Sequence, residues 1–375
     1  MKFFDHLVVG AGPAGCTIAR TLLDAGRSVL IIDKKHYVGG STADIYNEDV
    51  NCYVQIHGPH IFHTNSDEVV EFLSQYTSWR LYNHEVSARI GKIHVPLPIN
   101  YLTIAMIKGQ ENFPTSVVED QHVFEINEWM KIYENPANAY EQSLIRFGKA
   151  VTDSIFAPYS KKQWGTELQN LDPSLIARIP FLSSWNENED YFQKSFFQAQ
   201  PREGYTKLFE RMIEGATVLL GVENHEDILS EYTFNREKFW TGPIDKLVNE
   251  RPLIWRCSQF KFEKSQDHLI TAVVNTPSLN DDTIRLTDMA KTAGRPHNNR
   301  RSHTIIAHET VSGIGEPTYP MPSRVERLKA AQYKHLIAKD LRDWRVAGRL
   351  GAYQYFDMDQ AVAHGRRTAI DVLRQ

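Results

Sequence analysis

The first forty residues constrain the fold of this chain more than any other segment. A short apolar run, Phe4 to Val9, is followed at once by the glycine-rich sequence GAGPAG at 10–15. A helical pattern comes next, and a second apolar run over 29–32 ends at Asp33. This order of strand, glycine-rich turn, helix, strand and acidic residue is the βαβ fingerprint of dinucleotide-binding domains.

Each part of the fingerprint has a physical role. Gly10 permits the tight turn, Gly12 lets the backbone approach a pyrophosphate, and Gly15 lets the helix pack closely on the strand. Ala14 lies at the helix N-terminus, where free N–H groups attract an anion. Asp33 is placed to accept hydrogen bonds from a ribose diol. The sequence therefore predicts an ADP-containing cofactor.

The residues after the acid favour FAD over NAD. The glycine pair Gly39-Gly40 follows Asp33 within a few residues. In flavoproteins such a pair lets a loop run beside the cofactor, whereas NAD dehydrogenases usually continue into the next helix. The alternative is that the pair only marks a turn. We predict an FAD site to which Lys34, Gly39, Gly40 and Ser41 contribute.

Composition narrows the class of protein. A chain of 375 residues exceeds the usual size of one domain, so two or three subdomains are expected. The net charge of −4 indicates neither a nucleic-acid surface nor a membrane patch. Cys16, Cys52 and Cys257 are too few and too scattered for a disulfide framework or a zinc site, and Cys16 suits a small core position. Without a signal-peptide pattern or a long apolar run, we expect a soluble, cytoplasmic protein without a metal.

The remaining pattern predicts an α/β fold, in which a Rossmann-like FAD-binding domain carries an inserted helical domain and an antiparallel sheet domain. Helical periodicity is interrupted by prolines between 100 and 200, and short strands follow after 215. A loop rich in Gly, Asn and Arg is expected over about 276–302. The expected domains are a discontinuous FAD-binding domain (1–80, 205–245 and 340–375), a mainly helical substrate domain (100–200) and a sheet-rich substrate domain (80–99 and 246–339).

Several sequence blocks then make a more specific match. In their order along the chain, they resemble the UDP-galactopyranose mutase family. The blocks are GPHIFHTN at 58–65, KKQWG at 161–165, ARIP at 177–180, GYTKLFERM at 204–212, WTGPID at 240–245, HTIIAHE at 303–309, GEPTYP at 315–320 and GRLGAYQYFDMDQ at 348–360.

The resemblance implies a flavoenzyme that interconverts the pyranose and furanose forms of a nucleotide sugar. In that family, N5 of reduced FAD attacks the anomeric carbon and displaces the diphosphate, and the resulting adduct opens before the sugar ring recloses at the other size. This implies a UDP-linked nucleotide-sugar substrate, an external reductant and no side-chain nucleophile. It leaves a homodimer open.

The resemblance also assigns substrate-binding residues. Arg178 and Arg285 match the two arginines that clamp the diphosphate, because a guanidinium fits phosphate oxygens and stays charged. Tyr191, Tyr319 and Tyr355 are candidates for hydrogen bonds to the same phosphates. For each of these, ordinary core or surface packing is the alternative. The family pattern further implies Phe156 and Tyr159 beside the base, Trp164 beside the nucleotide sugar, and Asn275 in the substrate site.

The histidine-rich loop and the last block complete the candidate site. His60 is assigned to the flavin environment, whereas His63 is expected to be scaffold. We take His60, Arg178 and Arg285 as the candidate catalytic residues. The resemblance adds Gly348, Arg349, Tyr355, Asp357 and Met358 to the FAD site.

The chain departs from the family pattern on the substrate side. Residues 282–289 lack the tyrosine and the Glu-His pair that family members usually carry, and Thr310 follows Glu309 where a tyrosine is usual. The polar loop 295–301 adds Arg295, Arg300 and Arg301, and one of the last two could replace Arg285 at the second phosphate. Either the sugar or nucleotide pocket has changed, or the loop has drifted over the same UDP-galactose.

Three functional classes follow from these observations. The first is the mutase, acting on UDP-galactose or a modified-sugar relative. The second is an FAD oxidoreductase of the amine-oxidase type acting on a nucleotide-linked or other small substrate, and the third is a non-catalytic nucleotide-sugar binder. The intact fingerprint argues against the third class.

Overall fold

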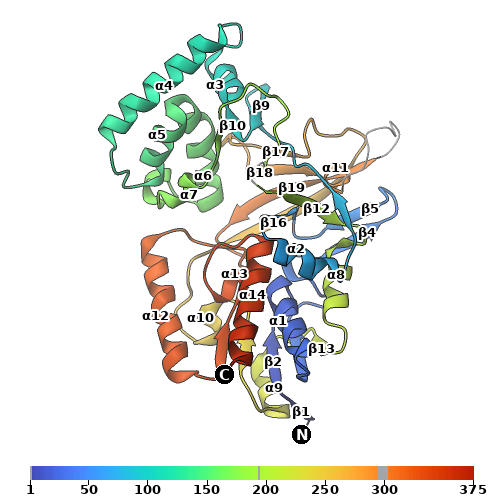
Figure 1. Ribbon diagram of the computed structural model, residues 1–375. Helices are drawn as coiled ribbons and strands as arrows, with labels where there is room; N and C mark the ends of the chain where they lie inside the picture. The colour runs from blue at the N-terminus through green and yellow to red at the C-terminus, as the bar shows by residue number, and fades with distance from the viewer. Residues whose placement is uncertain (1, 193–194, 294–302) are drawn as a thin grey trace.

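The structure, a computed structural model, describes residues 2–192, 195–293 and 303–375 (Figure 1). Arg295, Arg300 and Arg301, which the sequence places near the substrate, lie outside the described residues. Within the described part of the chain, no helix is long and apolar enough to span a membrane.

A parallel sheet of five strands forms the lower part of the molecule in Figure 1. Its strands are short apolar runs because helices cover both faces. Side chains alternate between the two faces: Val8 and Ile31 belong to one core, whereas Leu7, Leu30 and Ile32 belong to another. The strands, in sheet order, are β13 (Thr217–Leu220), β3 (Val29–Asp33), β2 (His6–Val9), β15 (Lys238–Trp240) and β21 (Trp344–Val346).

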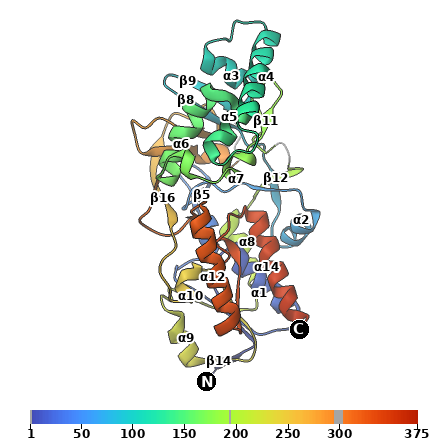
Figure 2. The same ribbon diagram turned by 90° about the vertical axis from the view of Figure 1, so that its left-hand side faces the viewer.

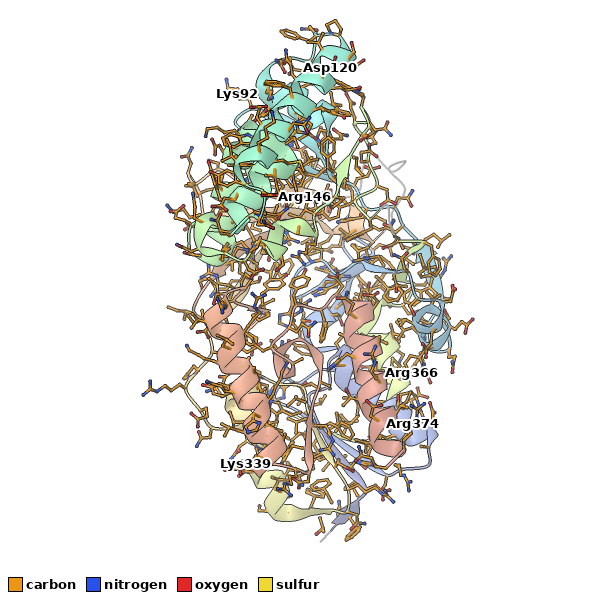
Figure 3. The ribbon with its side chains drawn as sticks, turned by 60° about the vertical axis from the view of Figure 1, so that its left-hand side comes forward. Lys92, Asp120, Arg146, Lys339, Arg366 and Arg374 are labelled. Carbon is orange, nitrogen blue, oxygen red and sulfur yellow. The ribbon has the colours of Figure 1, made fainter. Side chains whose placement is uncertain are left out.

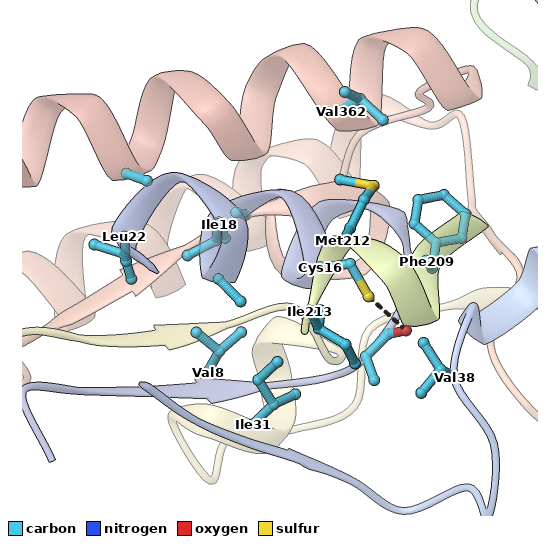
Figure 4. Close-up of a cluster of buried hydrophobic side chains, with 14 of the residues drawn as sticks. Val8, Cys16, Ile18, Leu22, Ile31, Val38, Phe209, Met212, Ile213 and Val362 are labelled. Carbon is cyan, nitrogen blue, oxygen red and sulfur yellow. Dashed lines mark hydrogen bonds between the residues drawn. The ribbon is translucent and has the colours of Figure 1, made fainter. Parts of the chain in front are cut away.

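One core lies between this sheet and three helices that pack together (Figure 4). Cys16 is buried in it, and its Sγ donates to the Ala11 carbonyl at 3.2 Å, so the predicted core position is confirmed. The helices are α1 (Pro13–Asp24), α8 (Gly204–Met212) and α14 (Met358–Leu373). The opposite core is covered by α9 (His225–Glu231), α10 (Ile244–Leu247) and α12 (Arg324–Asp340).

A mostly antiparallel sheet of seven strands lies between the parallel sheet and the helical end (Figure 1). The irregular loop expected over 276–302 is wrong for residues 283–292, because Thr283–Asp288 forms an inner strand of this sheet and Met289–Thr292 forms α11. Strand neighbours on both sides supply hydrogen bonds that the local sequence does not signal. The strands, in sheet order, are β20 (Tyr319–Pro320), β16 (Trp255–Ser265), β19 (Thr304–Ser312), β18 (Thr283–Asp288), β17 (Val273–Asn275), β8 (Val86–Ile90) and β9 (Ile93–Leu97).

The upper end of the molecule is a helical layer that packs on β8 and β9 (Figures 1 and 2). Its helices end at Ala177, so the expected helical stretch to 200 is too long, and Phe197–Pro201 instead forms β12 between β6 and β7. Arg146, labelled in Figure 3, donates from Nη2 to the Ile179 carbonyl at 2.6 Å and ties the layer to the segment after Arg178. The helices are α3 (Tyr101–Lys108), α4 (Thr115–Ile132), α5 (Ala139–Val151), a π-helical turn (Thr152–Phe156), α6 (Ala157–Trp164), a 3₁₀ turn (Leu168–Asn170) and α7 (Ser174–Ala177).

Smaller elements connect these layers. They are the parallel pairs β1 (Lys2–Phe4) with β14 (Tyr232–Phe234) and β10 (Ile99–Asn100) with β11 (Phe181–Leu182), the antiparallel pair β4 (Asp44–Asn47) with β5 (Cys52–Gln55), the strands β6 (Phe62–Thr64) and β7 (Trp79–Leu81), the helices α2 (Asp67–Ser74) and α13 (Gly348–Gly351), and a 3₁₀ turn (Gly40–Thr42).

Candidate active site

A cavity of about 840 Å³ opens at the carboxyl ends of β2, β3 and β15, where parallel sheets of this type bind dinucleotides. Most of the predicted cofactor residues line it. They are Gly10, Gly12, Ala14, Asp33, Lys34, Gly40, Ser41, His60, Gly348, Arg349, Asp357 and Met358.

The floor of this cavity is built to expose backbone. A Cβ at Gly10 would lie 2.0 Å from Thr241 Oγ1, and one at Gly40 would lie 2.8 Å from Gly12 Cα. Helix α1 begins beside them without a side-chain cap, which leaves its N-terminal N–H groups directed at the cavity. These features fit the pyrophosphate of a dinucleotide cofactor.

Asp33 and the three predicted cofactor residues that do not line the cavity contribute through the surrounding structure. Asp33 accepts hydrogen bonds from the Ala11 N–H at 2.7 Å and the Lys35 N–H at 2.8 Å, and its remaining lone pairs stay available to a ligand. The Gly15 Cα faces the Gly10 carbonyl beneath the turn, and the Gly39 N–H donates to the Ala11 carbonyl at 2.8 Å. Tyr355 stacks against arginines beside the cavity.

His60 lines the cavity with a neutral ring. Burial and the nearby Arg349 charge together lower its pKa to about 4. Its Nδ1 lies 3.0 Å from the Gly58 carbonyl, which makes Nδ1 the protonated nitrogen and leaves a lone pair on Nε2. The His60 carbonyl accepts from Gln55 Nε2 at 3.1 Å and from Gln200 Nε2 at 3.0 Å, so two buried side chains fix the peptide.

His63 has a packing role in this structure. Its ring stacks on Phe192 with centroids 3.7 Å apart, and its Nδ1 lies 3.1 Å from Ser195 Oγ. The His84 ring also stacks with Phe192, at 5.4 Å, and its carbonyl accepts from the Tyr191 N–H at 2.7 Å. These contacts hold the segment that carries Tyr191.

Beside the cavity, arginines and tyrosines from distant parts of the chain form an aromatic–cation cluster. Arg178 lies over the Tyr355 ring, 4.3 Å from its centroid, and Tyr355 stacks on Tyr319 at 5.9 Å. Arg349 lies 5.1 Å and 5.2 Å from the same two ring centroids, and it also lines the cavity. Arg349 therefore joins the cluster to the dinucleotide cavity. The Arg178 side chain remains exposed.

Arg285 occupies the inner part of this cluster. Its Nη2 donates to the Tyr159 hydroxyl at 3.4 Å, and its Nε lies 3.1 Å from Glu309 Oε2. Although burial lowers the pKa of Arg285, the Glu309 carboxylate raises it overall, so the guanidinium stays charged. Burial raises the pKa of Tyr159 and Tyr191, which keeps both phenols protonated as hydrogen-bond donors at neutral pH.

The other predicted substrate residues surround this cluster. Phe156 is buried against Phe147, with ring centroids 4.8 Å apart, and Trp164 lies edge-on to Tyr319 at 6.5 Å. Asn275 is paired directly with Arg285 across β17 and β18. The tertiary structure thus brings together residues from five separate sequence blocks.

Several residues of the site were not predicted from sequence. Glu309 is buried and accepts from Ser258 Oγ at 2.9 Å as well as facing Arg285. Gln55 and Gln200 hold His60 from two different strands. No local pattern distinguishes these side chains from ordinary polar strand residues, because their roles depend on how separate strands and loops come together.

Comparison with known proteins identifies the family. A family model described as UDP-galactopyranose mutase matches residues 154–355, more than half of the chain, and one described as an NAD(P)-binding Rossmann-like domain matches residues 8–76. This chain belongs to the UDP-galactopyranose mutase family.

Individual relatives agree with this assignment. The chain is 29% identical to a probable UDP-galactopyranose mutase of Klebsiella pneumoniae, over 98% of this chain and 94% of the relative. It is 27% identical to a dTDP-fucopyranose mutase of Escherichia coli, over 95% of each protein. A crystal structure of reduced UDP-galactopyranose mutase superposes with a TM-score of 0.74 at 14% identity, covering 99% of this chain and 94% of that one, and confirms the fold.

Membership in the UDP-galactopyranose mutase family makes this protein an isomerase with a flavin. Asp288 and Met289 of the divergent segment 282–289 lie in the interior of the protein. Asp288 is fully buried and accepts from the Lys291 N–H at 3.1 Å, and Met289 belongs to a small apolar core.

Proposed function

We propose that this protein interconverts the pyranose and furanose forms of a nucleotide sugar, with FAD in its reduced form as cofactor. The observation that carries the proposal is the convergence of Arg178, Arg285 and four tyrosines beside a glycine-floored dinucleotide cavity, joined to it by Arg349. Family membership supports the same reaction.

The protein's own residues would hold the leaving diphosphate during the reaction. Arg178 and Arg285 supply charged, forked donors, and the neutral phenols of Tyr159 and Tyr191 add hydrogen bonds without adding charge. Because Glu309 compensates Arg285, the cluster carries a smaller net charge than its arginines alone, which suits binding and later release of the diphosphate. When bound in its reduced form, FAD would supply the nucleophilic electron pair for displacement of the diphosphate from the sugar.

His60 would act on the cofactor side of the same site. Its neutral ring keeps an unprotonated Nε2 at the cavity wall, where it can accept a hydrogen bond from a reduced flavin. We therefore assign His60 to the flavin environment and Asp33 to the ribose of the cofactor.

The substrate is proposed to be UDP-galactose or a modified-sugar relative. The named activities of the relatives include both UDP-galactopyranose and dTDP-fucopyranose mutases. Both nucleotides therefore belong in the test.

The test is anaerobic incubation of dithionite-reduced, FAD-loaded protein with UDP-galactopyranose and dTDP-fucopyranose, followed by chromatography. We expect a furanose product from at least one substrate with reduced protein and almost none with oxidised protein. Equal turnover by both redox forms would contradict the proposal. An oxidised sugar product formed without added reductant would instead support the amine-oxidase-type alternative.

A further inference from the structure

Lys162 makes an unusual set of contacts at the join between helix α6 and the seven-stranded sheet. Its Nζ donates to three backbone carbonyls, those of Thr276 at 2.7 Å, Ser278 at 2.7 Å and Thr283 at 2.5 Å. The side chain is 8% exposed, and Asp281 Oδ1 lies 3.7 Å from the ammonium. All three protons of the ammonium are therefore used.

Two of these carbonyls belong to a single turn, and the third is that of Thr283, the first residue of β18. That turn connects β17 to β18, and thus leads from Asn275 to Arg285 on paired strands. If the ammonium were removed, the Thr276 and Ser278 carbonyls would lose this donor, whereas the Thr283 carbonyl would keep its hydrogen bond from Thr276 Oγ1. Lys162 therefore fixes the conformation of the hairpin that presents Arg285.

Helix α6, which carries Lys162, is also held in place. Tyr159 lies three residues before Lys162 on α6 and accepts the hydrogen bond from Arg285 Nη2. The C-terminus of α6 is held by Arg256 of β16, whose Nε donates to the Gln163 carbonyl at 2.7 Å and whose Nη2 donates to the Lys162 carbonyl at 3.2 Å. Helix α6 is thus a fixed base from which Lys162 reaches the hairpin.

We propose that Lys162 is a positioning residue. It sets the position of the Arg285 guanidinium relative to Tyr159 and thereby raises the affinity of the site for the substrate diphosphate. This inference rests on the proposed function, because it takes a nucleoside diphosphate as the ligand of Arg285. Lys162 itself does not need to touch the substrate.

The test compares Lys162→Met with Lys161→Met by calorimetric titration of UDP, with dTDP in parallel, into FAD-loaded oxidised protein. Lys161 is the matched control because its side chain is exposed and forms an ion pair with Glu167 at 2.6 Å. We expect Lys162→Met to weaken binding about tenfold, which lies within the range for residues coupled in one hydrogen-bonded network. Lys161→Met should bind like the wild type.

A double-variant cycle separates positioning from general damage. If Lys162 acts through Arg285, then Lys162→Met should change binding little, by less than about twofold, in the Arg285→Ala background. The inference would be overturned if the double variant lost affinity by the product of the two single fold-losses. Wild-type affinity in Lys162→Met would overturn it as well. If Lys162→Met fails to retain FAD, Lys162→Arg enters the same cycle, because a planar guanidinium cannot direct three N–H groups at carbonyls that converge on one point.

The two hypotheses fail in distinguishable ways. Wild-type protein that binds neither UDP nor dTDP, or Arg285→Ala that binds as tightly as the wild type, contradicts the proposed diphosphate site. Tight wild-type binding with a weakened Arg285→Ala and an unaffected Lys162→Met contradicts the positioning role alone.

Discussion

The glycine-rich turn offers a sharp test, because Gly12 and Gly15 are separated by one turn of α1 and are constrained for different reasons. A Cβ at Gly15 would lie 1.8 Å from the Gly10 carbonyl oxygen, whereas real Cβ contacts stop near 3.0 Å. The helix would have to move away from the turn by about 1 Å. A Cβ at Gly12 would lie 3.7 Å from its nearest neighbour, Gly40 Cα, and the backbone of Gly12 (φ −82°, ψ −177°) is accessible to alanine.

We therefore expect Gly15→Ala to lower the free energy of unfolding of the cofactor-free protein by about 1–3 kcal/mol, the usual cost of overpacking. Gly12→Ala should change that free energy by no more than about 1 kcal/mol. Because Gly12 lines the cavity where the backbone approaches a pyrophosphate, its alanine variant should bind FAD at least about tenfold more weakly, a loss of about 1.4 kcal/mol.

Urea unfolding of the cofactor-free variants and fluorescence titration with FAD measure the two effects separately. Gly26→Ala is a poor control because its φ is +72°, so the wild type and a Gly12→Ser variant serve for comparison. Equal destabilisation by Gly12→Ala and Gly15→Ala would refute the separation of roles. Wild-type FAD affinity in Gly12→Ala would refute the placement of the pyrophosphate.

Three further predictions concern the cluster and the fold. Arg285→Ala should destabilise the protein by about 3 kcal/mol, because Glu309 would remain buried without its partner. Arg285→Ala/Glu309→Leu should recover stability in urea unfolding without recovering UDP binding, and a stable single variant would contradict this reasoning. Arg178→Ala should weaken UDP binding by about 2–5 kcal/mol in calorimetry, with Arg178→Lys recovering only part and FAD content unchanged, and unaltered binding would remove Arg178 from the site. Burial lowers the pKa of His84 from an ordinary 6.5 to about 3, so the stability that the neutral ring contributes is complete above pH 6.5 and is lost as the pH falls toward 3. His84→Asn should flatten this part of the pH–stability curve, and an unchanged slope would contradict the assignment.

Features that depend on interactions between residues close in sequence were predicted, and features that depend on distant strands were not. The dinucleotide fingerprint could be predicted because its turn, helix and acid act on one another within about thirty residues of sequence, and the cavity lies where that pattern places it. The strand Thr283–Asp288 was missed because its hydrogen-bond partners lie on β17 and β19, and its own residues resemble those of a polar loop. Sequence signals strand formation weakly when neighbours provide most of its stability.

The sequence by itself determined the chemistry that is available: a glycine-floored nucleotide turn with Asp33, and the arginine and tyrosine blocks shared with the family. Tertiary structure decided how those groups are used. It left Arg178 exposed on Tyr355, buried Glu309 against Arg285, and joined the Arg285 hairpin to α6 through Lys162. Charge compensation depends on the pairing of two neighbouring strands, and the pairing of buried carbonyls depends on segments more than a hundred residues apart. No local propensity records those distances.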